Sequence, residues 1–171
     1  MQMVKKILFV LLLLWGALLL FMPKEELYFS LERELARQGV EINEGSVEEG
    51  VFGLTLEDVS IYVRGIKVAS VKKISLFTLL FYTKVDAEEI LADESLHTML
   101  PERIEEMVFT YSVLTPFTVH IEAIGSFGMA EGTASLKERL IHLDFKELKK
   151  ADMIRSKLIK GEKGWYYEAS F

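Results

Sequence analysis

The sequence lacks cysteine and is poor in the other residues on which catalytic and metal sites are commonly built. With no cysteine among its 171 residues, the chain has no disulfide, no thiolate zinc site and no thiol nucleophile. Histidine occurs only at His97, His120 and His142, on well-separated segments. Neither H-E-x-x-H nor D-x-D-x-D-G is present. The sequence therefore predicts no metal site, no cofactor and no catalytic residue.

Two further features bear on catalysis. His120 and His142 fall in neighbouring predicted strands, which leaves two interpretations open: a facing pair that binds a metal, or solvent-facing strand residues, which are far commoner. Adjacent acidic pairs such as Glu48-Glu49 point to opposite faces of a strand, so we interpret them as solvated side chains and not as acid–base pairs. Neither G-x-S-x-G nor a glycine-rich phosphate loop occurs. We predict that the protein is not an enzyme.

A concentrated basic surface is also missing. The chain has 20 Lys and Arg against 26 Asp and Glu, for a net charge of −6. Nucleic-acid-binding proteins need a dense basic patch, so this class is excluded. The length accommodates one domain of ordinary size and an appendage.

One long hydrophobic run is present, at the N-terminus. Lys5 and Lys6 precede an apolar run from Ile7 to Met22. As a helix this run would span roughly 24 Å, less than a hydrocarbon core of about 30 Å, a shortfall that snorkelling lysines can offset. No small-x-small site follows, which favours an uncleaved anchor over a signal peptide. The predicted anchor, residues 1–23, rests on Ile7, Leu8, Phe9, Leu11, Leu12, Leu13, Leu14, Trp15, Leu18, Leu19, Leu20 and Phe21.

The flanking charges predict an orientation for this anchor. Positive charge before the run and acidic charge after it (Glu25, Glu26) place the N-terminus in the cytoplasm. In a bacterium with two membranes, Lys24 to Phe171 would then lie in the periplasm. The predicted localisation is a single-pass protein of the bacterial inner membrane, with the lipid bilayer as a partner.

Residues 24–39 read as an amphipathic connecting helix. Pro23 suits the start of a helix, Glu25 and Glu26 complement its dipole, and Gly39 ends it. Leu27, Leu31 and Leu35 form one apolar stripe. Two interpretations remain: the stripe packs on the protein's own domain, which we favour, or it serves as a partner-binding stalk.

From residue 40 to residue 171 the apolar period is mostly two, which is typical of β-strands with one buried face. The predicted fold class is mainly β: an N-terminal transmembrane helix followed by a curved, mostly antiparallel β-sheet domain with flanking helices. The residues expected on the apolar core or groove face are Leu54, Leu56, Val59, Ile61, Val63, Val71, Ile74 and Leu76.

The alternation in this segment is interrupted, and the interruptions predict curvature. The phase changes at Glu57-Asp58, as expected for a β-bulge, and again between Val68 and Val71. Arg64-Gly65 is a plausible hairpin turn between these strands. Repeated slips of this kind indicate short, curved strands and not a flat sheet.

The remaining segments complete the predicted domain. Leu76 to Phe81 is almost wholly apolar, which favours burial over a membrane-dipping loop. The segment around Pro101 is ambiguous and is compatible with a short, broken helix. Residues 117–145 predict a three-stranded antiparallel meander, residues 146–161 a helix in their first part, and residues 165–171 a final strand or sheet edge.

Part of this pattern resembles known families. The segment from Gly39 to Leu76 contains L-x-L-x-x-V-x-I and then G-I-x-V-A-x-V, and it is similar to the type II secretion system protein N and AsmA-like families. The glycine-bearing hairpin "AIGSFGMAEGTASLKERLIHLDF" is similar to hairpins of the same group. The resemblance implies a curved β-groove in proteins linked to secretion machinery or to lipid movement across the periplasm. The lipopolysaccharide-transport protein C family has a similar architecture.

Two functions follow as hypotheses. The first is a non-enzymatic accessory or scaffold protein of a secretion or envelope-assembly system, anchored in the inner membrane, with envelope or secretion-system proteins as partners. The alternative is a lipid-binding or lipid-transfer module whose groove holds acyl chains. Packing of the apolar face against the protein's own helices would favour the scaffold, and an open apolar groove would favour the lipid module.

Overall fold

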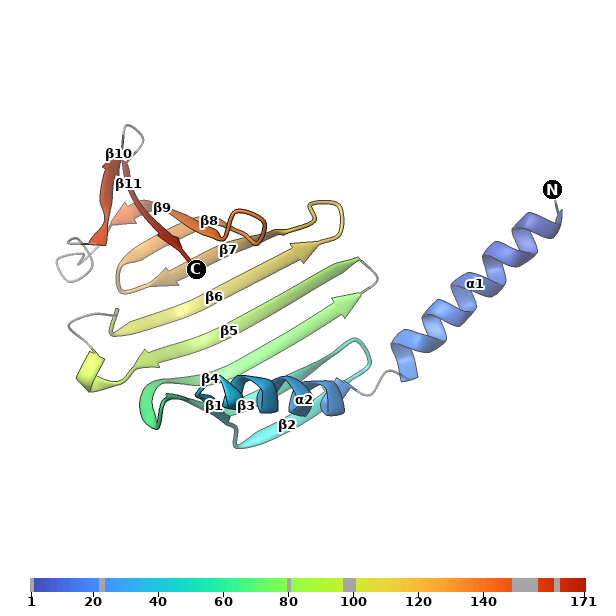
Figure 1. Ribbon diagram of the computed structural model, residues 1–171, viewed down its shortest axis with the longest axis horizontal. Helices are drawn as coiled ribbons and strands as arrows, with labels where there is room; N and C mark the ends of the chain where they lie inside the picture. The colour runs from blue at the N-terminus through green and yellow to red at the C-terminus, as the bar shows by residue number, and fades with distance from the viewer. Residues whose placement is uncertain (1, 22–23, 80, 97–100, 149–156, 162–163) are drawn as a thin grey trace.

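The computed structural model describes residues 2–21, 24–79, 81–96, 101–148, 157–161 and 164–171 (Figure 1). Its elements along the chain are α1 (Gln2–Phe21), α2 (Lys24–Arg37), β1 (Val40–Asn43), β2 (Ser46–Gly50), β3 (Gly53–Val63), β4 (Ile66–Leu79), β5 (Tyr82–Ala92), the 3₁₀ turn η1 (Glu94–Leu96), β6 (Arg103–Ser112), β7 (Thr118–Gly125), β8 (Gly128–Ser135), β9 (Leu140–Leu148), β10 (Ile159–Gly161) and β11 (Gly164–Ser170).

Within these residues all strands join one antiparallel sheet in the order β1-β3-β4-β5-β6-β7-β8-β9-β11-β10. Strand β2 also pairs with β3, so β1 and β2 lie one after the other along the same edge. From β3 to β9 each strand pairs with the next strand in the sequence. Such neighbour-to-neighbour pairing needs only short turns, for example Arg64-Gly65, where both residues have a positive φ.

The strand register separates an apolar face from a polar face. One row of paired residues crosses eight strands on the apolar face: Leu54, Leu76, Val85, Phe109, Ile121, Gly132, Leu143 and Tyr167. The adjoining row on the opposite face is Thr55, Ser75, Asp86, Val108, Glu122, Glu131, Asp144 and Tyr166. Alternation along each strand therefore gives the sheet one apolar and one largely polar side, as predicted.

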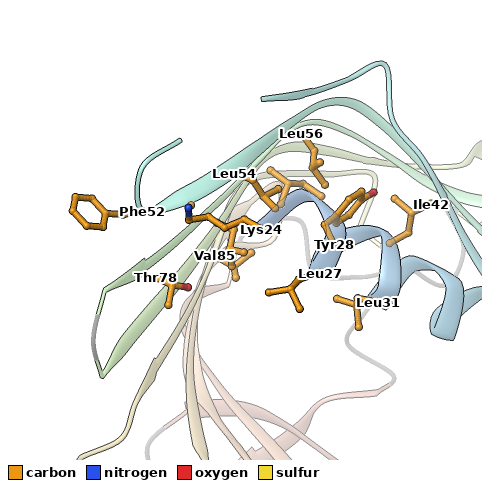
Figure 2. Close-up of a pocket in the computed structure, with 13 residues that line it drawn as sticks. Lys24, Leu27, Tyr28, Leu31, Ile42, Phe52, Leu54, Leu56, Thr78 and Val85 are labelled. Carbon is orange, nitrogen blue, oxygen red and sulfur yellow. The ribbon is translucent and has the colours of Figure 1, made fainter. Parts of the chain in front are cut away.

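The predicted interruptions of the alternation correspond to irregular backbone. Asp58 has a φ of 52°, and Glu89, on strand β5, has a φ of 53°. Strands β3 and β4 also shift register between Ile61 and Tyr62, opposite the residues around Val68. These irregularities keep Val59 and Val71 on the apolar side with Leu54 and Leu56, although the spacing along the strand is not a multiple of two. They account for a sheet that curves around α2 (Figure 2).

Helix α2 lies on the apolar side at the β1–β3 end of the sheet (Figure 1). It begins after Pro23 with Glu25 and Glu26 in its first turn, and Arg37 lies in its last. Charges in these positions complement the helix dipole. The observed helix matches the predicted connecting helix to within two residues. It contacts β1, β2 and β3 of the protein's own domain, although Leu27 and Leu31 of the predicted stripe stay exposed.

Helix α1 corrects the sequence-based prediction of a membrane anchor. In the part of the chain that the structure describes, no helix combines the length and the apolar character needed to cross a membrane. Helix α1 runs from Gln2 to Phe21. Three predictions are therefore wrong: the anchor at residues 1–23 with its span residues Ile7 to Phe21, the single-pass inner-membrane localisation with a periplasmic domain, and the transmembrane part of the fold class.

Helix α1 also contacts the sheet domain, since the rings of Trp15 and Phe81 lie with their centroids 6.0 Å apart.

Other predictions for the domain had mixed outcomes. The antiparallel meander over residues 117–145 and the final strand are confirmed as β7, β8, β9 and β11. The helix predicted from residue 146 is wrong where it can be compared, because β9 continues to Leu148 and Ile159–Gly161 is strand β10. Residues 149–156, like 97–100 with His97, lie outside the described residues. Burial of the Leu76 to Phe81 run is also wrong for Phe77, Leu79 and Phe81, which are exposed.

Gly53, at the start of β3, supplies a test of the close strand pairing. A Cβ atom there would overlap the carbonyl oxygen of Leu76 on β4, whereas a Cβ on Gly50 would meet its nearest atom at 3.5 Å. We expect Gly53→Ala to lower the free energy of unfolding by about 1–3 kcal/mol, because the paired strands must separate. The control, Gly50→Ala in the same hairpin, should stay within about 0.5 kcal/mol of wild type. Urea titrations of both variants measure this, and equal effects would contradict the register.

Candidate functional site

A cavity lies between α2 and the apolar face of the sheet (Figure 2). Its volume is about 370 Å³. Thirteen residues from α2, β1, the β2–β3 turn, β3, β4 and β5 line it: Lys24, Leu27, Tyr28, Leu31, Ile42, Phe52, Gly53, Leu54, Leu56, Ile74, Leu76, Thr78 and Val85. We call this cavity the α2 groove.

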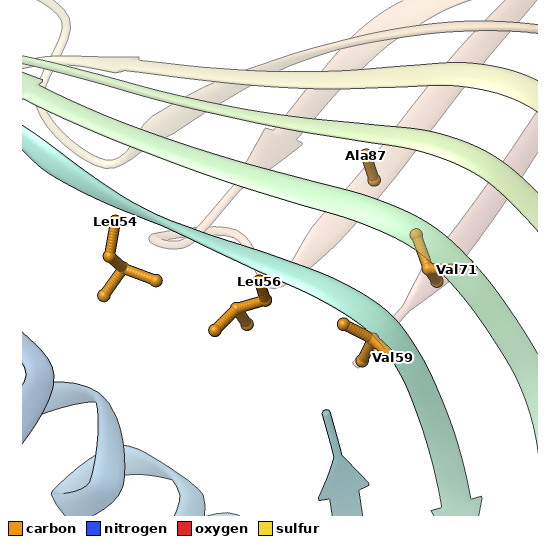
Figure 3. Packing of buried hydrophobic residues seen from close by; sticks show 5 residues of the cluster. All are labelled: Leu54, Leu56, Val59, Val71 and Ala87. Atoms are coloured by element: carbon orange, nitrogen blue, oxygen red, sulfur yellow. The ribbon is translucent and has the colours of Figure 1, made fainter. Parts of the chain in front are cut away.

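The floor of the α2 groove is formed by the cross-strand rows. Leu54 pairs with Leu76, which pairs with Val85, and Leu56 pairs with Ile74 in the next row. Figure 3 shows Leu54 and Leu56 pointing toward α2 from the same face of β3. Both belong to the main core cluster, with Val59, Val71 and Ala87. The floor is therefore made of well-buried aliphatic side chains held by strand pairing.

The roof is α2, and it does not close on the floor. Leu27 is 47% exposed and Leu31 58% exposed, although both line the groove. Of the helix side chains, Tyr28 is the one that packs against the core cluster. The apolar stripe of the helix thus faces the apolar face of the sheet across unfilled space. The exposed aliphatic side chains of the groove lie on the helix side, whereas the sheet side is buried or half-buried.

Polar contacts hold α2 at one edge of the sheet. The Tyr28 hydroxyl donates a hydrogen bond of 3.0 Å to Oε2 of Glu44, in the turn between β1 and β2. Lys24 Nζ lies 3.5 Å from Oε1 of Glu49, on β2. Burial, and then the bond to the Glu44 carboxylate, raise the pKa of Tyr28 well above its usual value. These contacts fix the helix along β1 and β2, while the groove opens toward β4 and β5.

The polar atoms of the lining are few and mostly engaged. Tyr28 is bonded to Glu44, and the Thr78 hydroxyl lies 3.4 Å from the Thr83 hydroxyl. Lys24 is the charged residue of the lining, and the aliphatic part of its side chain forms part of the apolar wall (Figure 2). No described side chain in the groove forms a nucleophile–base pair. The groove is suited to binding an apolar group and offers no arrangement for acyl or phosphoryl transfer.

The apolar face continues beyond the groove. The row through Leu54 extends over β6 to β11, and the row through Leu56 continues as Ala87, Met107, Ala123, Ala130, Phe145 and Trp165. A second buried cluster lies here, around Ala123, Phe127 and Ala130. Ile104, Met107 and Phe145 pack against this cluster.

The structure places seven of the eight predicted face residues, all but Val63, in or against one core cluster. Leu54, Leu56, Ile74 and Leu76 line the groove, whereas Val59 and Val71 lie in the adjoining core. Ile61 packs on that core and Val63 is exposed at the hairpin end. The prediction missed Lys24, Tyr28, Ile42, Thr78 and Val85 as lining residues. The leucine stripe of residues 24–39 was the available signal, since it required an apolar surface opposite it.

The two histidines in the meander are separated by an intervening strand. Register places Thr133 between His120 and His142 in one cross-strand row. His142 instead lies 3.3 Å from Glu168 and 3.5 Å from Asp144, and its ring stacks on Tyr166 with centroids 5.1 Å apart. Within the described residues no cluster of three potential ligands occurs. The pair belongs to the polar face of the sheet.

The Tyr28–Glu44 contact predicts a pH-dependent attachment of α2. Because the pKa of Tyr28 is raised in the folded state, the stabilisation is complete below the unfolded value of about 10 and is lost as the pH rises above it. Tyr28→Phe should cost about 1 kcal/mol of unfolding free energy at pH 8 and weaken the loss of stability between pH 9 and 11. A double-mutant cycle with Glu44→Ala should give a coupling of similar size. Strict additivity would show that the hydrogen bond does not hold the helix.

No protein-family model, curated protein or solved structure matches this chain. The resemblance to the type II secretion system protein N and AsmA-like families stays a prediction from the sequence pattern.

Proposed function

We propose that the protein binds the acyl chain of a lipid or fatty acid in the α2 groove. The observation that carries this proposal is the exposure of Leu27 and Leu31 inside a cavity that is lined mostly by apolar side chains. A helix that served only to cover the sheet would bury its stripe against the core. Here the stripe and the sheet remain apart, at a spacing that leaves room for a ligand.

Size and chemistry of the groove agree with such a ligand. Its volume of about 370 Å³ falls within the range of about 300–1,000 Å³ that is usual for small-molecule sites. Each methylene moved from water into an apolar site contributes about 0.8 kcal/mol. An acyl chain can gain affinity from length alone, without specific polar contacts along its tail. A site lined almost wholly by aliphatic and aromatic side chains suits this mode of binding.

The attachment of α2 suggests how the chain enters and leaves. The helix contacts β1, β2 and β3, whereas the floor extends to Ile74, Leu76 and Thr78 on β4 and Val85 on β5. The side toward β5 is therefore the open one. An acyl chain can slide in along the floor from this side while the Tyr28–Glu44 contact of α2 stays in place. Binding requires no disruption of the sheet.

The scaffold function in a secretion or envelope-assembly system stays a prediction. Packing of the apolar face on the protein's own helices was the feature expected to favour it, and α2 provides that packing only through Tyr28 and its neighbours. The open groove favours the acyl-binding alternative. The envelope proteins and the bilayer named as partners likewise stay predictions.

Chain length provides the first test. For saturated fatty acids of ten to sixteen carbons, we expect the affinity to rise about tenfold for every two methylenes until the groove is full, because each buried methylene contributes about 0.8 kcal/mol. Isothermal titration calorimetry below the micellar concentration measures the series, and native mass spectrometry gives the stoichiometry. A flat series, or no bound fatty acid at all, would refute the proposal.

The exposed leucines allow a second test that spares the fold. Leu31→Gln places an amide in the groove at a position that is 58% exposed, so the unfolding free energy should change by less than about 0.5 kcal/mol. Affinity for a sixteen-carbon chain should fall about tenfold, because the amide must be desolvated. The matched control is Ala36→Gln, at an exposed position of the same helix outside the groove lining. Equal affinity of the two variants would place the ligand elsewhere.

A further inference from the structure

The side chain of Lys24 is only 12% exposed and lies in the wall of the apolar groove. We propose that Lys24 is the head-group ligand of the site, and that the natural ligand is an anionic amphiphile whose carboxylate or phosphate pairs with Lys24 Nζ. This inference rests on the proposed acyl-binding function and narrows its ligand class.

The partner that the structure gives Lys24 is a weak one. Glu49 Oε1 lies 3.5 Å from Nζ, whereas strong charge-assisted hydrogen bonds measure about 2.7–2.9 Å. The Glu49 side chain is 40% exposed, so it can turn into solvent without being buried unpaired. An ammonium group has three donors, which leaves it capacity for another anion. Glu49 therefore acts as a replaceable counter-ion that offsets the cost of the partly buried charge in the free protein.

The position of Lys24 along the groove fits an amphiphile. Figure 2 shows the Lys24 nitrogen on the side of the groove nearer to Phe52, while Leu31 and Ile42 lie on the other side. Lys24 and Leu31 are seven residues apart on α2, which is about 10 Å along the helix axis. A head group at Lys24 thus directs the tail along the helix toward Leu31. The acidic neighbours Glu25 and Glu26 are exposed and take no part in the lining.

A neutral apolar ligand would leave this arrangement unused. It would gain from the leucines and the floor, but it would have no interaction with Nζ, and the Lys24–Glu49 pair would persist. Charge at the head therefore distinguishes the two ligand classes. Different substitutions also test the two parts of the ligand, since the leucines would contact its tail and Lys24 would pair with its head group.

The test compares hexadecanoate, hexadecyl phosphate and methyl hexadecanoate on the full chain by calorimetry below the micellar concentration. Wild type should bind either anion about tenfold more tightly than the ester. Lys24→Gln should remove this preference while leaving the affinity for the ester within twofold, and Lys24→Met should do the same. Glu49→Gln should raise the affinity for the anions several-fold, because the competing carboxylate is gone. Lys72→Gln, at an exposed position outside the groove lining, controls for net charge and should bind like wild type.

The outcomes separate this inference from the function on which it rests. Equal affinity of wild type for ester and anions, or an unchanged preference in both Lys24 variants, would overturn the head-group assignment while acyl binding stands. Failure of all three ligands to bind would overturn both. If the phosphate binds more tightly than the carboxylate, the ligand is a phospholipid-type amphiphile, and the reverse order assigns it to free fatty acids.

Discussion

A large antiparallel sheet with one apolar face must cover that face, and this constraint shapes the rest of the molecule. The strand register aligns apolar residues in continuous rows from β3 to β11, so the surface to be covered extends across most of the sheet. A single helix of fourteen residues, α2, lies against it among the described elements. One such helix spans about 21 Å, far less than the width of the sheet, where each strand adds about 4.8 Å.

The sheet meets this constraint in different ways at its two ends. Around Ala123, Phe127 and Ala130, small side chains and curvature allow the apolar surface to pack on itself. At the β1–β3 end, curvature is produced by irregular backbone at positions such as Asp58, and α2 is fixed along the edge by Tyr28–Glu44 and Lys24–Glu49. Both contacts lie on the same side of the helix, with the β1–β2 segment. The other side stays lifted from β4 and β5, and the groove results from this asymmetric attachment.

The apolar groove therefore follows from ordinary sheet physics and not from a dedicated catalytic apparatus. The floor of the groove is part of the hydrophobic core and consists of the same leucines that stabilise β3 and β4. The two exposed leucines of α2 and one shielded lysine also line the groove. They lie on the helix and not in the sheet, so substitutions there should have little effect on the fold. This separation allows the floor and the roof to be probed independently.

The sequence by itself determined the strands, their curvature and the polarity of each face, because alternation and its slips are local properties that survive in the folded chain. It also indicated the helix and its leucine stripe through end signals near Pro23 and Gly39. It misjudged residues 7–22, where an apolar run was taken as a membrane span. It likewise misjudged Ile159–Gly161, where strand pairing outweighed a helical pattern. Only the tertiary structure decided that Lys24, Ile42 and Val85 meet around one cavity, because these residues come from elements far apart in the chain. The gap between α2 and the sheet was equally beyond sequence reasoning, since it depends on where Tyr28 and Lys24 find their acidic partners.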